Sequence, residues 1–220
     1  MNKTEIIAQI EKEKLIAIVR GVKTADLVPT AEAMYAGGVR LLEITYSANG
    51  TVSDEETANG IRTLKSHFGD RMCIGAGTVL TPAQVELTAK AGGEFIISPD
   101  TNAEVIQKTV SLGLVSIPGA LTPTEAQNAH RAGADFVKLF PITSLGLAYV
   151  KAIRAPLSHI KFLAVGGIDE TNMADYLAAG VRGFGIGSNI VNKKLIEAGD
   201  FEAVTALANR FINALQEAQA

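Results

Sequence analysis

Two ionisable residues lie inside apolar segments, where a charge is costly, and these residues could do chemistry. Lys138 lies in Phe136–Pro141 (FVKLFP) and Glu43 lies in Leu41–Thr45 (LLEIT). Burial disfavours the ammonium form of a lysine and lowers its pKa, and a neutral amine can attack a carbonyl carbon to form a Schiff base. A neighbouring carboxylate could transfer protons. Two alternatives stay open: a lysine that reaches solvent at a strand end, and a glutamate in a structural ion pair with Lys138 or Arg20.

Candidate ligand-binding residues end several other apolar segments. Arg20 ends Leu15–Arg20 and supplies a cation for a phosphate or a carboxylate, unless it pairs with Glu43. Thr78 follows a glycine-rich stretch and offers a hydroxyl and an amide N–H. Late in the chain, two segments end in small residues that either serve turn geometry alone or let backbone N–H groups approach a phosphate: Gly166, Gly167, Gly187 and Ser188.

The candidate residues lie in or after short apolar runs that alternate with helical segments along the chain. Apolar runs without polar alternation are typical of parallel strands covered on both faces. The polar candidates come late in several runs, and a closed barrel brings all strand ends to one face, whereas an open sheet would scatter them. We therefore predict an α/β fold, a (β/α)₈ TIM barrel in a single domain over residues 1–220. The eight predicted strands are Leu15–Arg20, Leu41–Tyr46, Cys73–Val79, Phe95–Pro99, Val115–Gly119, Phe136–Pro141, Lys161–Gly167 and Gly183–Ser188.

Local signals predict where the intervening helices begin and end. Thr81-Pro82 and Thr122-Pro123 each place a capping hydroxyl before a proline of the first turn. Asp169-Glu170 is expected to open a helix with acidic residues. An additional N-terminal helix over Lys3–Glu13 is expected to cap the bottom of the barrel. Four Ala-Gly pairs are expected to end helices just before strands: Ala36-Gly37, Ala91-Gly92, Ala132-Gly133 and Ala179-Gly180.

Composition narrows the class of protein. The 220 residues carry a net charge of −3 without a basic run, which gives no electrostatic case for nucleic acid or anionic lipid. No apolar stretch is long enough to span a membrane and no signal core is present, so a cytoplasmic location is expected. The lone cysteine, Cys73, excludes a disulfide framework or a cysteine-built zinc site. The three histidines are scattered over predicted helices and loops, so neither a metal nor a cofactor is expected.

Several ordered motifs carry a resemblance to a known family. The motifs are LEIT (42–45), GAGTVL (75–80), ISP (97–99), IPG (117–119), KLFP (138–141), GGI (166–168) and IGS (186–188). With these motifs, the sequence from about Leu15 to about Leu215 resembles the 2-keto-3-deoxy-6-phosphogluconate (KDPG) / 4-hydroxy-2-oxoglutarate (KHG) aldolases. The resemblance implies a trimeric (β/α)₈ barrel with a class I, metal-free mechanism.

The resemblance also implies roles for individual residues. Lys138 matches the Schiff-base lysine and Glu43 the glutamate that transfers protons. The implied reaction is cleavage of a 2-keto-3-deoxy-6-phospho-sugar acid, of gluconate or galactonate type, to pyruvate and glyceraldehyde 3-phosphate. The alternatives are cleavage of 4-hydroxy-2-oxoglutarate to pyruvate and glyoxylate, and a non-catalytic sugar-phosphate-binding barrel. The implied substrate-binding residues are Thr78 and Pro118 around the pyruvate unit, Gly166, Gly167, Gly187 and Ser188 around the phosphate, and Arg20, which matches an arginine of some branches.

One departure from the family concerns the substrate carboxylate. Gluconate-type enzymes carry an arginine after the strand motif where this chain has Ser47. The phosphogalactonate branch also lacks that arginine, and its Ala-Val-Gly-Gly string is similar to Ala164–Gly167. The loop Ser47–Glu56 is expected to be longer than in either branch. Because loops at this end of a barrel set specificity, the departure bears on which keto acid is cleaved.

Overall fold

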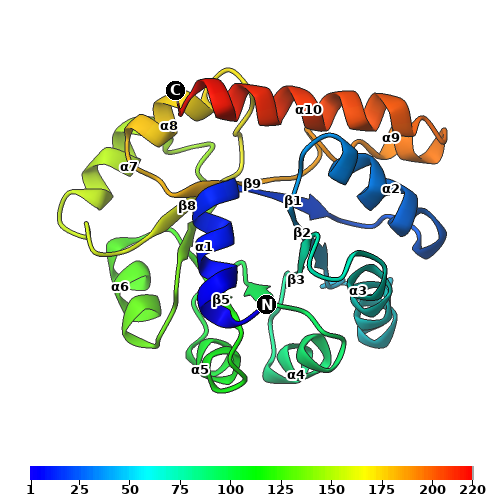
Figure 1. The fold of residues 1–220 in the computed structure, drawn as a ribbon. Helices are drawn as coiled ribbons and strands as arrows, with labels where there is room; N and C mark the ends of the chain where they lie inside the picture. Colours follow the sequence, from blue (N-terminus) through cyan, green and yellow to red (C-terminus); the bar gives the residue numbers. More distant parts are fainter. Residues whose placement is uncertain (220) are drawn as a thin grey trace.

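The computed structural model describes residues 1–219, which alternate between strands and helices (Figure 1). The strands are β1 (Leu15–Val19), β2 (Leu41–Thr45), β3 (Cys73–Gly77), β4 (Phe95–Ile97), β5 (Val115–Ile117), β6 (Gly119–Ala120), β7 (Val137–Leu139), β8 (Phe162–Val165) and β9 (Gly183–Ile186). The helices are α1 (Lys3–Glu13), α2 (Thr24–Ala36), α3 (Asp54–Phe68), α4 (Pro82–Lys90), α5 (Ala103–Ser111), α6 (Pro123–Arg131), α7 (Gly146–Arg154), α8 (Met173–Ala178), α9 (Lys193–Glu197) and α10 (Phe201–Glu217).

The strands form one parallel sheet that closes on itself. Their order is β5-β4-β3-β2-β1-β9-β8-β7-β6, and β5 and β6 are consecutive parts of one strand. At this closing strand, Ser98 N–H donates to Ile117 O on one side (3.2 Å) and Lys138 N–H donates to Pro118 O on the other (2.9 Å). Pro118 has no N–H to give, so the ladder is interrupted there. The predicted eight-strand barrel is therefore confirmed, with its fifth strand divided in two at Pro118.

The predicted helix boundaries hold with one exception. Thr81 and Thr122 cap α4 and α6 through their hydroxyls. Gly92, Gly133 and Gly180 have left-handed backbone at the predicted helix ends, whereas after Ala36-Gly37 it is the next residue, Gly38, that does. The prediction that Asp169-Glu170 opens a helix is wrong, because α8 begins only at Met173. The Asp169 carboxylate instead accepts hydrogen bonds from the backbone N–H (2.9 Å) and hydroxyl of Thr171, closing a local turn.

Helix α1 closes the amino-terminal end of the barrel, as predicted. It crosses the centre of the ring in Figure 1, and its Ile6 and Ile10 are almost fully buried. Lys3 pairs with Asp135 at 2.9 Å, which fixes the helix at the start of β7. The interior apolar cluster beneath the site comprises Ile6, Ile10, Ile16, Leu41, Cys73, Phe95, Ile97, Val115, Ile117, Phe136 and Leu163.

A second and larger apolar layer lies between the strands and the surrounding helices. Leu42 and Ile44 on β2 and Val137 and Leu139 on β7 belong to it, while Glu43 and Lys138 between them do not. This alternation is the period of two of a strand, so the two ionisable residues face the barrel interior. The outer layer is therefore apolar, and the two ionisable residues lie inside the barrel.

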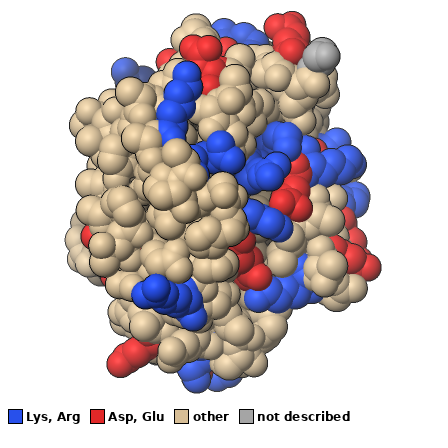
Figure 2. All heavy atoms as spheres, turned by 90° about the vertical axis from the view of Figure 1, so that its left-hand side faces the viewer, with Lys and Arg blue, Asp and Glu red and all other residues tan. Residues whose placement is uncertain are grey.

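The surface of the molecule is mixed in charge. On the face drawn in Figure 2, Lys and Arg side chains are interspersed with Asp and Glu. Within residues 1–219, no helix has both the length and the apolar character needed to cross a membrane.

Candidate active site

Glu43 and Lys138 are both buried at the middle of the barrel interior. The exposed fraction is 1% for Glu43 and 7% for Lys138. Glu43 pairs in register with Ile18 of β1 and Gly75 of β3, and Lys138 pairs with Gly119 of β6 and Leu163 of β8. The Lys138 amine also lies 4.4 Å from the centre of the Phe140 ring, two residues along the same face. The alternative in which Lys138 reaches solvent is therefore wrong.

The electrostatics of this pair are dominated by burial. Burial raises the pKa of Glu43 to about 7, and the positive charges of Lys138 and Arg20 oppose this rise. Burial lowers the pKa of Lys138 below its ordinary value, Glu43 opposes this shift, and Arg20 adds to it. Glu43 is thus poised to exchange protons near neutral pH, which is the property that acid–base chemistry needs, and the lowered pKa of Lys138 favours its neutral amine.

Glu43 is not held by a structural ion pair. Among the described residues, no Lys or Arg nitrogen lies within 4 Å of its carboxylate, and its Oε2 has no hydrogen-bond partner. A buried carboxylate oxygen without a partner is costly, so natural folds keep one mainly for a purpose. The ion-pair alternative for Glu43 is wrong, and the free oxygen faces the interior that Lys138 shares.

Gly77 makes the room that Glu43 needs. An ideal Cβ on Gly77 would collide with the Glu43 carboxylate. Gly77 is the last residue of β3, which pairs in register with β2. A glycine here allows the carboxylate to pack against the backbone of the neighbouring strand.

We expect Gly77→Ala to lower kcat by about 10- to 100-fold, because displacement of a catalytic group by about 1 Å has effects of this size. The measurement is steady-state kinetics of the aldol cleavage together with the melting temperature. Gly75→Ala is the matched control, since its Cβ would meet the Phe95 ring instead of Glu43 and should lower stability more than kcat. Unchanged kcat in a folded Gly77→Ala variant would contradict this role of Gly77.

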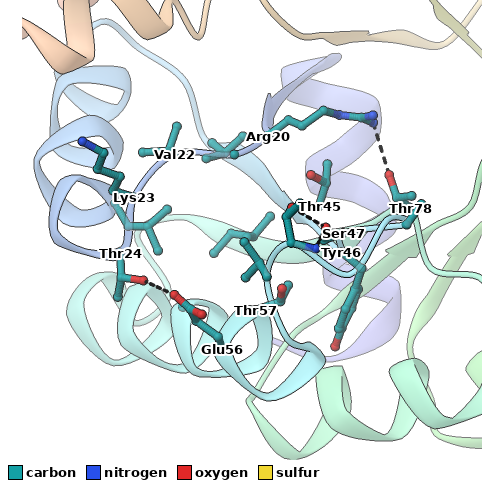
Figure 3. Close-up of a pocket in the computed structure, with 18 of the residues that line it drawn as sticks. Arg20, Val22, Lys23, Thr24, Thr45, Tyr46, Ser47, Glu56, Thr57 and Thr78 are labelled. Atoms are coloured by element: carbon teal, nitrogen blue, oxygen red, sulfur yellow. Dashed lines mark hydrogen bonds between the residues drawn. The ribbon is translucent and has the colours of Figure 1, made fainter.

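Arg20 and Thr78 meet across the mouth of the barrel. Arg20 Nη2 donates to Thr78 Oγ1 at 3.2 Å (Figure 3). Thr78 has a φ of +55°, which is unusual for a β-branched residue. Such strain gathers at ligand sites, where the fold holds a side chain in place against its preference. These two predicted binding residues therefore come together, and Arg20 contacts Thr78 rather than forming an ion pair with Glu43.

Ser47 lies in a compact turn after β2. Its hydroxyl donates to Asn49 Oδ1 (2.8 Å) and accepts from Thr51 N–H (3.1 Å). The predicted loop Ser47–Glu56 ends earlier than expected, because Ser53 caps α3, which begins at Asp54. This turn, together with α2 and α3, encloses a crevice of about 610 Å³ beside the mouth of the barrel (Figure 3).

The predicted phosphate-binding residues fall into two groups. Gly187 and Ser188 line a cavity of about 540 Å³ together with Arg20, and a Cβ on Gly187 would meet open space. Gly166 and Gly167 do not line this cavity. Both have left-handed backbone and lie against Thr143 of the loop after β7. Pro118, the remaining predicted residue, is buried and lies beside the backbone of Lys138.

Two residues that the sequence analysis did not single out also border the site. The sequence shows Gly77 only as part of the GAGTVL motif. Its contact with the Glu43 carboxylate depends on how two neighbouring strands pair, which the sequence does not show. Lys193 lines both the 540 Å³ cavity and the 610 Å³ crevice. Its one sequence signal is a pair of lysines shortly after the last predicted strand.

Comparisons with known proteins show which family this chain matches. The sequence model of the family described as "KDPG and KHG aldolase" matches residues 6–207. A probable 2-dehydro-3-deoxy-6-phosphogalactonate aldolase from Rhizobium meliloti (strain 1021) is 40% identical over 198 residues, covering 88% of this chain and 90% of that protein. The 2-dehydro-3-deoxy-6-phosphogalactonate aldolase of Escherichia coli (strain K12) is 36% identical, covering 94% of this chain and 97% of that protein.

A solved structure extends the likeness to three dimensions. KDPG aldolase from Legionella pneumophila, with pyruvate captured at low pH as a covalent carbinolamine intermediate, is 30% identical. It superposes with a TM-score of 0.82, and the match covers 92% of this chain and 96% of that chain. With the barrel, the buried lysine–glutamate pair and these relatives together, the chain belongs to the family of KDPG and KHG aldolases.

Proposed function

We propose that this protein is a class I aldolase that cleaves a 2-keto-3-deoxy-6-phospho-sugar acid to pyruvate and glyceraldehyde 3-phosphate. The observation that carries the proposal is the buried pair of Lys138 and Glu43 at the middle of the barrel interior. The captured pyruvate intermediate of the Legionella pneumophila relative supports the same covalent chemistry. The family resemblance supports a mechanism without a metal ion.

The first half of the reaction joins the substrate to the enzyme. The neutral Lys138 amine adds to the C2 ketone, and the resulting carbinolamine loses water to give an iminium ion. Burial favours the neutral amine, because it lowers the pKa of Lys138. The positive iminium nitrogen then serves as an electron sink beside C3.

The second half breaks the carbon–carbon bond. Glu43, as a carboxylate, takes the proton of the C4 hydroxyl while the C3–C4 bond breaks. The electron pair of the C3–C4 bond moves toward the iminium nitrogen. Glyceraldehyde 3-phosphate leaves and an enamine remains on Lys138. Protonation of the enamine at C3 and hydrolysis of the iminium release pyruvate and restore the amine.

The binding residues divide between the two ends of the substrate. We assign Thr78 and Pro118 to the pyruvate unit, because Thr78 follows Gly77, against which the Glu43 carboxylate packs, and Pro118 lies beside the backbone of Lys138. Gly187 and Ser188 are assigned to the phosphate, since they line a cavity with a cation. Gly166 and Gly167 are assigned to the same end, where their lack of side chains leaves the backbone accessible.

The galactonate type is the substrate we favour. The two phosphogalactonate relatives are 40% and 36% identical, whereas a 2-dehydro-3-deoxy-phosphogluconate aldolase of Treponema pallidum is 34% identical and the gluconate-type Legionella pneumophila enzyme is 30% identical. Ser47 and the Ala164–Gly167 string point in the same direction. The cationic 540 Å³ cavity favours a phosphorylated substrate over 4-hydroxy-2-oxoglutarate.

We expect kcat/KM for 2-keto-3-deoxy-6-phosphogalactonate to exceed that for the phosphogluconate epimer by about tenfold or more, because a misplaced hydroxyl costs about 1–3 kcal/mol in the transition state. The measurement is cleavage of both epimers and of 4-hydroxy-2-oxoglutarate under one condition. A higher value for 4-hydroxy-2-oxoglutarate would favour the alternative activity. Binding of both phosphorylated acids without turnover would favour a non-catalytic barrel.

The family resemblance also supports proposals on the oligomeric state and the cellular location of the protein. We propose that the protein forms a homotrimer and acts in the cytoplasm on a small phosphorylated keto acid. The chain is proposed to form a single domain over residues 1–220, since one closed barrel accounts for all strands of the described part.

A further inference from the structure

The cavity at the carboxyl ends of β1 and β9 is positively charged. Arg20, Lys193 and Lys194 line it together with Gly187 and Ser188, and no Asp or Glu of residues 1–219 does. Three cations without a carboxylate make a site for an anion, because opposite charge lowers the free energy of a bound phosphate. Both lysines lie outside the motifs that carry the family resemblance.

Lys193 is placed differently from its neighbour Lys194. It lines both the cavity and the adjoining crevice, whereas Lys194 lines the cavity alone. Its amine lies over Gly21, where an ideal Cβ would be 2.8 Å from Nζ. The absent side chain and the left-handed backbone of Gly21 (φ +62°) thus let the lysine reach across to the loop after β1. Arg20 also lines both the cavity and the crevice, so Arg20 and Lys193 border a shared opening.

The charge of Lys193 is available for a ligand. Within the described part of the chain, no carboxylate lies within 4 Å of its amine, although half-buried lysines such as Lys108 and Lys161 have such partners. An ammonium on a flexible stem binds phosphate as a point charge, while backbone amides such as those of Gly187 and Ser188 fix its orientation.

We infer that Lys193 contacts the phosphate end of the substrate and sets the preference for phosphorylated over unphosphorylated ligands. The inference rests on the proposed aldolase function and adds to it a residue outside the family motifs. Lys193 takes no part in bond cleavage, because the reacting carbons lie at Lys138. Its effect is therefore on binding of the phosphate and not on the rate of the chemical step.

The test is Lys193→Met in the condensation direction, with pyruvate and either glyceraldehyde 3-phosphate or glyceraldehyde as the acceptor. We expect the KM for glyceraldehyde 3-phosphate to rise about tenfold, as for loss of one charge-assisted contact. The KM for glyceraldehyde and kcat with either acceptor should change less than about twofold. The rise should shrink at high salt, because ions screen an exposed charge.

Lys23→Met is the matched control, since Lys23 is exposed and lines the crevice but not the cavity. It should leave every parameter unchanged. An equal rise for both acceptors, an equal effect of Lys23→Met, or no rise in the Lys193 variant would each overturn the inference. Borohydride trapping of pyruvate on the wild-type enzyme separates the two proposals: a normal adduct with an unchanged KM in Lys193→Met rejects the role of Lys193 alone, and a missing adduct rejects the aldolase mechanism.

Discussion

Lys138→Met is expected to abolish aldol cleavage, with a fall in kcat of at least about 10⁴-fold, because no other amine can form the iminium ion. Met nearly preserves the length of the side chain and keeps the apolar contacts with the barrel interior. The variant should be at least as stable as the wild type near neutral pH, since it removes a buried amine whose charged form is disfavoured. The measurements are the rate of pyruvate release and a denaturant titration.

Lys161→Met is the matched control for this prediction. Lys161 precedes β8, pairs with Glu11 of α1 at 3.1 Å, and lies 5.4 Å from the Phe136 ring at the amino-terminal end of the barrel. Its replacement should leave kcat within about twofold, because only an exposed ion pair is lost. A Lys138→Met enzyme that retained full turnover would rule out the Schiff-base mechanism.

Glu43→Gln is expected to lower kcat by about 10²–10⁴-fold, because the amide cannot accept the proton of the C4 hydroxyl. The pH profile should change with it. Glu43 must be ionised to act as a base, so kcat/KM of the wild type should rise with pH up to the pKa of about 7 and level off above it. The variant should lack this dependence on pH. A profile that is flat between pH 5 and pH 8 in the wild type would contradict the assignment of Glu43.

The same substitution should raise stability at alkaline pH. Folding raises the pKa of Glu43 from 4.5 to about 7, so the folded protein holds this proton more tightly than the unfolded chain. The contribution of Glu43 to the free energy of unfolding therefore falls as the pH rises from 4.5 to about 7 and stays constant above that. At pH 8 the variant should be more stable by on the order of 3 kcal/mol, with no difference near pH 4.

Glu94→Gln is the control that distinguishes a catalytic effect of Glu43→Gln from a structural one. Glu94 is also buried, but its carboxylate accepts from Ile74 N–H (3.0 Å) and pairs with Lys65 (2.8 Å). Its replacement should lower stability by about 1–3 kcal/mol and leave kcat nearly unchanged. A loss of activity equal to that of Glu43→Gln would show that any change to a buried glutamate harms this barrel.

The sequence was sufficient to predict the barrel and the faces of its strands. Runs such as Leu41–Thr45 and Phe136–Pro141 have an ionisable residue between apolar neighbours, and the period of two then places it on the opposite face. Pro118 broke the fifth strand in a way that the run of apolar residues did not reveal. The start of α8 was also predicted too early, because an aspartate such as Asp169 can accept hydrogen bonds in a local turn as readily as at the start of a helix.

The arrangement of the site depended on contacts between distant residues. That Glu43 has a free oxygen and not an ion pair follows from the register of β2 against β3, which sequence spacing does not determine. The placement of Lys193 over Gly21 is set by two loops that pack together in three dimensions. Such contacts join residues far apart in the chain.

The most direct test of the Schiff-base mechanism is borohydride reduction of the enzyme with pyruvate, followed by peptide mass spectrometry. The mechanism predicts a single pyruvate-derived adduct, and it predicts that adduct on Lys138. Lys161→Met should give the same adduct as the wild type. Absence of an adduct in folded protein, or an adduct on another lysine, would contradict the assignment of Lys138 as the residue that forms the covalent bond.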